Sequence, residues 1–230
     1  MTDIPSPGLT RIYYPPPPWF LRGSVLAATC LIRASTVEAL VPEPLALFRL
    51  PGNMAIGYLA VAHYTAGSTR EYNELVAGVV VRHKSLYGPY ITHTGADDAQ
   101  AQVAGRDVWH LPRQAWRFEW EFEQPETRVR VWDGVRLVCS IIGVPPMARL
   151  FPLNVSYPFL NMQGIHPTTI PITYDVRATS TGWKLQVGPD GPLAFFKPFG
   201  PLATFVVKGW ARLEAPRLLD PPPAEPQPEE

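Results

Sequence analysis

The sequence predicts a mostly β fold with few short helices, and three observations lead to this fold class. Proline occupies 28 of the 230 positions. Because proline is disfavoured inside helices and central strands, this composition favours many short strands joined by fixed turns. Residues 116–123 alternate between aromatic and charged side chains, the period of a strand with one buried and one solvated face. Asp133-Gly134, between two further alternating runs, is typical of a tight β-hairpin.

Apolar and alternating runs predict strands along most of the chain, at residues 23–33, 46–50, 54–64, 75–81, 90–94, 116–123, 128–144, 170–178, 183–187, 193–196 and 203–213. A short helix is predicted at 35–41, because Ser35 can cap it and Glu38 follows three residues later. Residues 99–103 fit either a strand or a helix. Residues 147–170 contain several prolines and are predicted to form a loop.

The domain organisation follows from the two proline-rich ends. Residues 1–9 are predicted to be an extended arm, 10–218 a single β-rich domain, and 219–230 a disordered acidic tail. The arm has two interpretations, a ligand for an SH3-type domain or a wrap over the body of the protein. Trp19-Phe20-Leu21 supplies its apolar anchor.

Composition excludes several classes of function. Lys plus Arg and Asp plus Glu each number 20, so no net charge favours nucleic acid or an anionic membrane. No apolar run approaches the roughly 20 residues that span a bilayer, and no signal peptide opens the chain. The expected location is therefore the cytoplasm. Cys30 and Cys139 lie in apolar runs and are expected to be buried reduced thiols.

No motif predicts a metal or a cofactor. The five histidines have no metal-binding spacing, and neither a glycine-rich phosphate loop nor a nucleophile elbow is present. Lysine is rare, and Lys208 alternates with Trp210 and Arg212 on what we expect to be a surface face.

One region carries a specific arrangement of motifs. A strand at 90–93 is followed by Asp97-Asp98, then Gly105-Arg106-Asp107, then Pro112-Arg113. Upstream lie a helix-ending proline motif at 41–45 and the segment Tyr72-Asn73-Glu74. In order and spacing these landmarks, over about residues 33–116, resemble the acetoacetate decarboxylase family. The resemblance implies an α+β, mostly antiparallel β-barrel or cone that holds a small ligand, and a homo-oligomer.

The resemblance also implies a chemistry that this chain cannot perform in the usual way. The family forms a Schiff base through a lysine that follows the proline, and here that position is Arg113, with Gln114 at the neighbouring lysine position. A guanidinium has a pKa above about 12 and does not act as a free amine. The family's pocket arginine near the first strand has no clear counterpart, since Arg22 is several residues away.

We therefore predict a family member without Schiff-base decarboxylase activity that binds a small oxo- or hydroxy-carboxylic acid. Arg113 is expected to hold the carboxylate, and Glu74 to act as acid or base. In the structural alternative these two residues form an internal ion pair. Gln114, His93, His110 and Trp116 are the further candidates to contact the ligand, with core or surface positions as their alternative.

Two other functions stay open at this point. One is a lyase or isomerase that uses Glu74 on a different small organic ligand. The other is a non-catalytic binding or assembly module that works through the proline-rich ends. An open cavity with Glu74 and Arg113 on its wall favours a ligand site, whereas a cavity filled by aromatic side chains favours a structural role.

Overall fold

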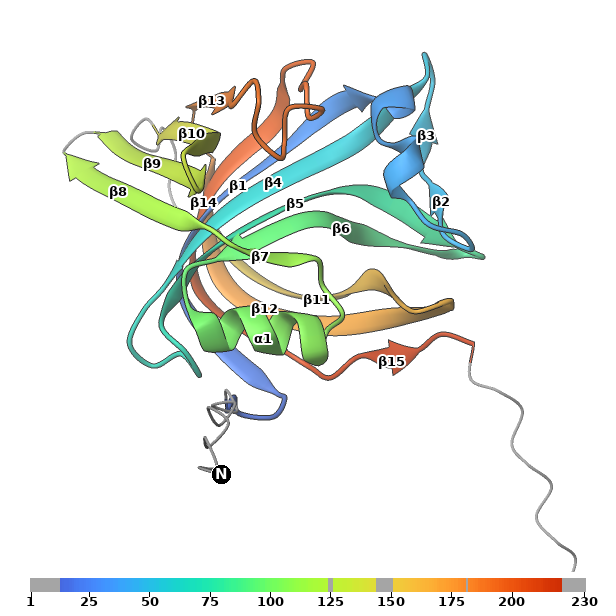
Figure 1. Ribbon diagram of the computed structural model, residues 1–230, viewed down its shortest axis with the longest axis horizontal. Coiled ribbons are helices and arrows are strands. Elements are labelled where there is room, and N and C mark those ends of the chain that lie inside the picture. The colour runs from blue at the N-terminus through green and yellow to red at the C-terminus, as the bar shows by residue number, and fades with distance from the viewer. Residues whose placement is uncertain (1–12, 124–125, 144–150, 181, 221–230) are drawn as a thin grey trace, which may run out of the picture.

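The computed structural model describes residues 13–123, 126–143, 151–180 and 182–220. Its main feature is a barrel closed by seven strands, in the order β5-β4-β1-β14-β12-β11-β6 and back to β5 (Figure 1). These strands are β1 (Trp19–Arg33), β4 (Met54–Tyr64), β5 (Tyr72–His83), β6 (Leu86–Ala96), β11 (Phe151–Gln163), β12 (His166–Ser180) and β14 (Pro201–Leu213). Neighbours are antiparallel except β6 and β11, which run parallel and meet at Tyr90 and Leu160. The predicted antiparallel barrel is thus confirmed, with one parallel junction.

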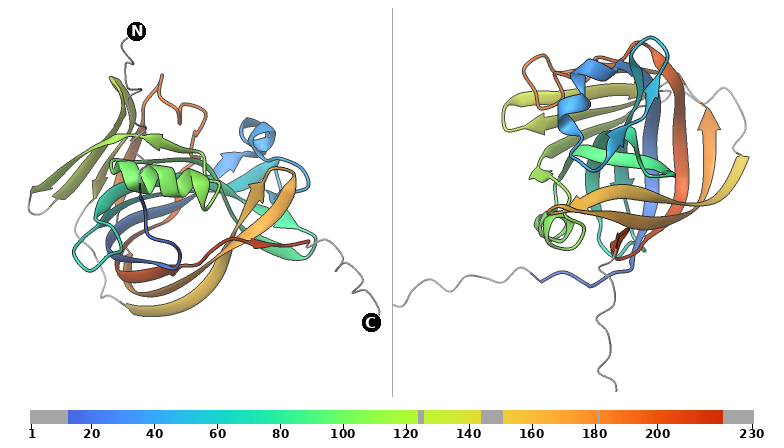
Figure 2. Two further views of the ribbon diagram at one scale, coloured as in Figure 1. Left: turned by 60° about the horizontal axis from the view of Figure 1, so that its bottom comes forward. Right: turned by 90° about the vertical axis from the view of Figure 1, so that its right-hand side faces the viewer.

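A second sheet lies beside the barrel as a separate layer (Figures 1 and 2). Its strands, in the order β13-β10-β9-β8, are β8 (Arg117–Glu123), β9 (Glu126–Asp133), β10 (Arg136–Gly143) and β13 (Trp183–Val187). Four short strands extend the barrel sheet: β2 (Ala46–Leu47), β3 (Arg49–Leu50), β7 (Arg113–Ala115) and β15 (Arg217–Leu218).

The ambiguous segment at 99–103 belongs to the helix α1 (Ala99–Asp107). The Asp98 side chain accepts a hydrogen bond of 2.7 Å from the backbone N–H of Ala101, which caps the helix. Two 3-10 turns, η1 (Ala34–Thr36) and η2 (Glu38–Leu40), replace the helix predicted at 35–41. The segment is therefore helical as predicted, but the predicted capping box does not form, because Ser35 makes no cap and Glu38 instead pairs with Arg49.

The loop predicted at 147–170 was wrong over the part that the structure describes, because β11 and the start of β12 occupy it. Strand β11 pairs with β12 along one side, and on its other side it meets β6 at Leu160. Pro152 and Pro158 are tolerated because most of that second side behaves as a strand edge, where proline is allowed. Residues 193–196, predicted as a strand, form turns. The strands at 54–64 and 183–187 have the predicted bounds.

The strands β1, β4 and β5 are covered on both faces. Along β4, Ala55, Leu59 and Val61 are buried in the core shared with Val129 and Ile141 of the second sheet. The intervening side chains of β4, Ile56, Tyr58, Ala60, Ala62 and Tyr64, point into the barrel. Successive residues of a strand point to opposite faces, and both faces of β4 have apolar surroundings. The sequence of β4 is therefore apolar at nearly every position.

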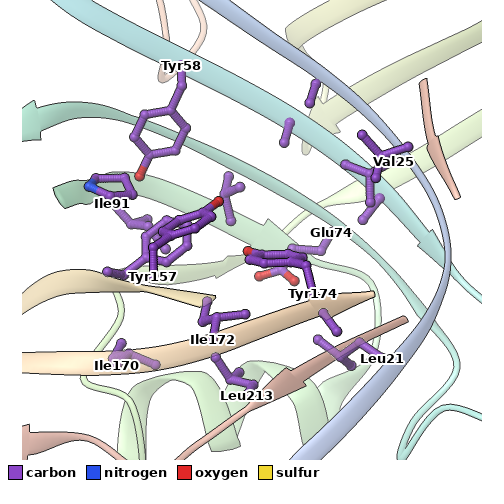
Figure 3. Close-up of a pocket in the computed structure, with 18 of the residues that line it drawn as sticks. Leu21, Val25, Tyr58, Glu74, Ile91, Tyr157, Ile170, Ile172, Tyr174 and Leu213 are labelled. Atoms are coloured by element: carbon purple, nitrogen blue, oxygen red, sulfur yellow. The ribbon is translucent and has the colours of Figure 1, made fainter. Parts of the chain in front are cut away.

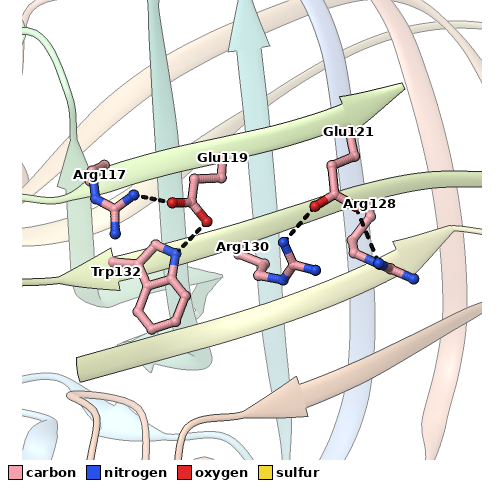
Figure 4. Close-up of polar contacts among 6 residues, drawn as sticks. All are labelled: Arg117, Glu119, Glu121, Arg128, Arg130 and Trp132. Carbon is pink, nitrogen blue, oxygen red and sulfur yellow. Dashed lines mark hydrogen bonds and ion pairs between the residues drawn. The ribbon is translucent and has the colours of Figure 1, made fainter. Parts of the chain in front are cut away.

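The outer face of the second sheet carries the predicted pairing of arginines with glutamates (Figure 4). Glu121 accepts hydrogen bonds from Arg128 and Arg130 of the neighbouring strand, and Glu119 accepts one from the Trp132 indole N–H, at 2.9 Å. The hairpin predicted at Asp133-Gly134 is confirmed, with φ of +59° at Gly134. These partly exposed pairs form the solvated side of the sheet.

Several smaller expectations concern single residues. Cys30 and Cys139 are confirmed as buried free thiols, and burial raises the pKa of each to about 12. Trp19 is fully buried and donates to the Pro15 carbonyl at 2.8 Å, while Lys208 is exposed. The arm at 1–9 and positions 221–230 of the tail lie outside the described residues. Within the described ranges, no helix is long and apolar enough to cross a membrane.

The core between barrel and second sheet gives a direct test. Leu59 is 1% exposed, and Leu59→Ala should lower the free energy of unfolding by about 2–5 kcal/mol, because it leaves a cavity in a close-packed core. Val135 is 94% exposed in the hairpin turn, so Val135→Ala should change the free energy of unfolding by less than about 0.5 kcal/mol. Urea unfolding of both variants measures the difference, and equal effects would contradict this account of the core.

Candidate functional site

The barrel encloses a cavity of about 630 Å³ (Figure 3). Most of its lining is aliphatic or aromatic, and every one of the seven barrel strands contributes to it. Tyr58, Tyr157 and Tyr174 point into it from three different strands, with Glu74 beyond them. The cavity is within the usual size range of small-molecule sites and is not filled by aromatic side chains.

The two ends of the cavity differ. At one end Trp109 and Leu111, which follow α1, line the cavity and pack in a core with Ala101 and Ala104 of the helix. At the other end Tyr87 and Leu153 line the cavity and are exposed, at 53% and 37%. The helix therefore closes one end, and exposed apolar side chains surround the opening.

A charged pair lies on the wall near the closed end. Glu74 and Arg113 line the cavity and form an ion pair between Glu74 Oε1 and Arg113 Nη2. Their side chains are only 6% and 3% exposed. Tyr72 donates to Glu74 Oε2 at 3.3 Å, and Thr94 donates to Oε1 at 3.4 Å. The Nη1 group of Arg113 donates to the Ala101 carbonyl at 3.1 Å.

The local fold brings these two residues together from distant parts of the chain. In the sheet, Glu74 of β5 is opposite Ala96 of β6, and Thr94 of β6 is opposite Arg113 of β7. Gly105 of α1 leaves room for the arginine, because a Cβ there would lie 2.6 Å from Arg113 Cδ. The Gly105 and Pro112-Arg113 landmarks in the sequence thus meet in space.

The surroundings set the charge state of the pair. Burial by itself would lower the pKa of Arg113, but the charge of Glu74 and then the neighbouring Tyr72 and Tyr64 raise it above its ordinary value. The pKa of Tyr64 is raised by burial and by the charge of Glu74, and that of Tyr174 by burial and by Tyr157. Arg113 is therefore a fixed cation, and these tyrosines are neutral hydrogen-bond donors.

The other residues predicted to contact a ligand do not line this cavity. Trp116 is 3% exposed in the core between the two sheets, where its ring lies directly over Gly95. His93 packs against Phe195 at 4.8 Å between ring centroids, and burial lowers its pKa. His110 is half-buried with φ of +53°, and Gln114 is exposed on β7.

Sequence reasoning missed the tyrosines of the cavity. Tyr58 and Tyr64 are on β4, Tyr157 is on β11 and Tyr174 is on β12. The even spacing of Tyr58 and Tyr64 along β4 places both on one face of the strand. The opposite face is equally apolar, so the sequence pattern alone does not show which face is inside. Tyr58 Oη is buried without a hydrogen-bond partner among the described residues.

The described residues also hold no group of three or more His, Cys, Asp or Glu side chains that could bind a metal ion.

Comparison with known proteins places the chain in a family. The family model for acetoacetate decarboxylase (ADC) matches residues 3–144. The chain belongs to the acetoacetate decarboxylase family. A comparison with curated proteins finds no match.

Solved structures of this family share the fold. The acetoacetate decarboxylase of Legionella pneumophila superposes with a TM-score of 0.72 at 14% identity, covering 95% of this chain and 93% of that one. The enduracididine biosynthesis enzyme MppR gives 0.68 at 13%, covering 93% and 91%. An acetoacetate decarboxylase-like enzyme of Sphingomonas wittichii gives 0.64 at 12%, covering 88% and 92%. At these identities the similarity establishes the fold alone.

Within this acetoacetate decarboxylase fold, no lysine reaches the cavity. The four lysines of the sequence are Lys84, Lys184, Lys197 and Lys208, and all are exposed and absent from the lining. The cationic group on the cavity wall is the Arg113 guanidinium.

The buried pair predicts strong energetic coupling. Glu74→Gln and Arg113→Met should each destabilise the protein by about 3–5 kcal/mol, because each leaves one buried charge without its partner. The double variant should be less destabilised than the sum of the singles, by about 2 kcal/mol or more. Denaturant unfolding of the four proteins measures this coupling, and simple additivity would show that the pair does not form.

The contact between Gly105 and Arg113 predicts a second coupling. Gly105→Ala should destabilise by about 1–3 kcal/mol, since overpacking outweighs the roughly 1 kcal/mol gained in helix propensity. Shortening the side chain with Arg113→Ala should remove most of that cost. Gly182→Ala is the control, because no atom lies within 4 Å of the added Cβ. An unchanged cost of Gly105→Ala in the Arg113→Ala background would refute the contact.

Proposed function

We propose that this chain binds a small oxo- or hydroxy-carboxylic acid in the barrel and transforms it by acid–base chemistry, without a Schiff base. The observation that carries the proposal is the guanidinium of Arg113 on a cavity wall that no lysine reaches. A Schiff base requires a neutral amine, whereas a guanidinium binds carboxylates in a two-pronged manner. MppR, which shares the fold, has been solved in complex with pyruvate, and this supports an oxo acid as the ligand class.

In this proposal the two charged residues have different roles. Arg113 holds the ligand carboxylate, and Glu74, steadied by Tyr72 and Thr94, faces the carbon or hydroxyl that exchanges a proton. An incoming carboxylate and Glu74 then share one guanidinium.

A second function is favoured by one specific observation. Arg113 is already neutralised by Glu74, so the pair presents no net charge to the cavity. This suits a lyase or isomerase in which Glu74 acts on an uncharged carbonyl compound. Binding of neutral ketones with the same affinity as the corresponding acids would favour this alternative.

The absence of Schiff-base chemistry is tested by trapping. Incubation with acetoacetate or pyruvate and borohydride should leave the mass of the protein unchanged, because no lysine lies beside the ligand. An acetoacetate decarboxylase with its lysine serves as the positive control. A covalent adduct on any lysine, located by peptide mass spectrometry, would overturn the proposal.

Binding of pyruvate tests the role of Arg113. Calorimetry should show affinity in the wild type, because the Arg113 guanidinium is a permanent cation that pairs with a carboxylate. The variant with Glu74→Gln and Arg113→Gln removes both charges and remains folded, and it should lose this binding. Arg136→Gln, on the exposed hairpin, is the control and should bind as the wild type does. Undiminished binding by the double variant would remove Arg113 from the site.

A further inference from the structure

The cavity is much larger than its polar end requires. Its volume of about 630 Å³ corresponds to roughly 20 water molecules at about 30 Å³ each. A pyruvate-sized acid beside Arg113 fills a small fraction of it. The remaining lining is aliphatic or aromatic, including Val25, Val76, Phe159 and Val207.

The cavity is also long in one direction. Along β5 its lining extends from Glu74 to Val80, which is about 20 Å at about 3.4 Å per residue. Glu74 is opposite Ala96 at one end of β6, whereas Val80 is opposite Pro89 near the other end. The charged pair is therefore at the closed end, and the exposed Tyr87 and Leu153 are at the opening.

The middle of the cavity supplies apolar contacts and one isolated donor. Tyr157 and Tyr174 stack with 5.3 Å between ring centroids and an interplanar angle of 20°, and together form a flat wall. Tyr58 Oη is one of the buried hydroxyls for which the described residues supply no hydrogen-bond partner. A polar atom part-way along a ligand would supply that partner, and an unpaired buried hydroxyl is otherwise unfavourable.

From this geometry we propose that the ligand is an oxo or hydroxy acid with a long apolar substituent, alkyl or aryl. Its head group lies at Glu74 and Arg113, and its tail extends between the tyrosines toward the opening. The head-group assignment rests on the proposed function. The tail assignment rests on the volume, length and lining of the cavity.

A chain-length series tests the tail separately from the head. Calorimetry with pyruvate, 2-oxobutanoate, 2-oxohexanoate and 2-oxooctanoate should show affinity rising with each methylene. A fully buried methylene corresponds to about fourfold in Kd, so 2-oxooctanoate should bind at least about 30-fold more tightly than pyruvate. The neutral 2-octanone, which lacks the carboxylate, should bind more weakly than 2-oxooctanoate.

Variants that fill the cavity provide the structural control. Ala27 and Ala60 are opposite each other on β1 and β4, and both line the cavity. Ala60→Phe, and independently Ala27→Phe, should keep pyruvate binding and lose most of the gain from the longer chain. Val135→Phe adds the same side chain to the exposed hairpin and should leave the whole series unchanged. Pyruvate binding and thermal unfolding verify that each variant is folded.

The outcomes separate the two proposals. Equal affinities along the series, with pyruvate binding still dependent on Arg113, would overturn the tail and leave the proposed function standing. Equal binding of 2-octanone and 2-oxooctanoate would keep the tail and refute the carboxylate site. No binding of any probe would refute both. A gain with chain length that Ala60→Phe or Ala27→Phe removes establishes the tail.

Discussion

The ion pair between Glu74 and Arg113 is the constraint on which the closed end of the barrel depends. A charge in an apolar cavity is stable only when another charge and hydrogen bonds compensate its lost hydration. Tyr72, Thr94 and the Ala101 carbonyl supply those hydrogen bonds from β5, β6 and α1. Helix α1 therefore contacts the pair through the Ala101 carbonyl while Ala101 and Ala104 pack in the core at this end of the barrel.

The second sheet explains why the cavity is apolar and unfilled. It covers the outer faces of β1, β4 and β5, so the packing that stabilises these strands lies outside the barrel. Their inner faces are free to enclose space without loss of the main core. The inner faces of these strands line the cavity, and their outer faces form the main core. Mutations on the inner faces should therefore affect ligand binding, whereas mutations on the outer faces should affect stability.

The chain has the family fold, and this fold places an arginine side chain on the wall of the cavity. Gly105 leaves the space that the Arg113 side chain occupies, where α1, β6 and β7 meet. A guanidinium carries a permanent positive charge and has no amine lone pair that attacks a carbonyl. Fold alone does not determine function, so the chemistry of this cavity depends on the side chains that line it.

The sequence by itself determined the β-rich class, several strands and the hairpin at Asp133-Gly134, because these depend on local periodicity or turn geometry. Tertiary structure decided the rest. Strand β11 forms despite its prolines because β12 pairs with it, and Tyr58 and Tyr64 line the cavity because the second sheet covers the other face of β4. The partner of Arg113 is 39 positions away in sequence. Where both faces of a strand are apolar, alternation specifies two faces, but only long-range packing specifies which of them is inside.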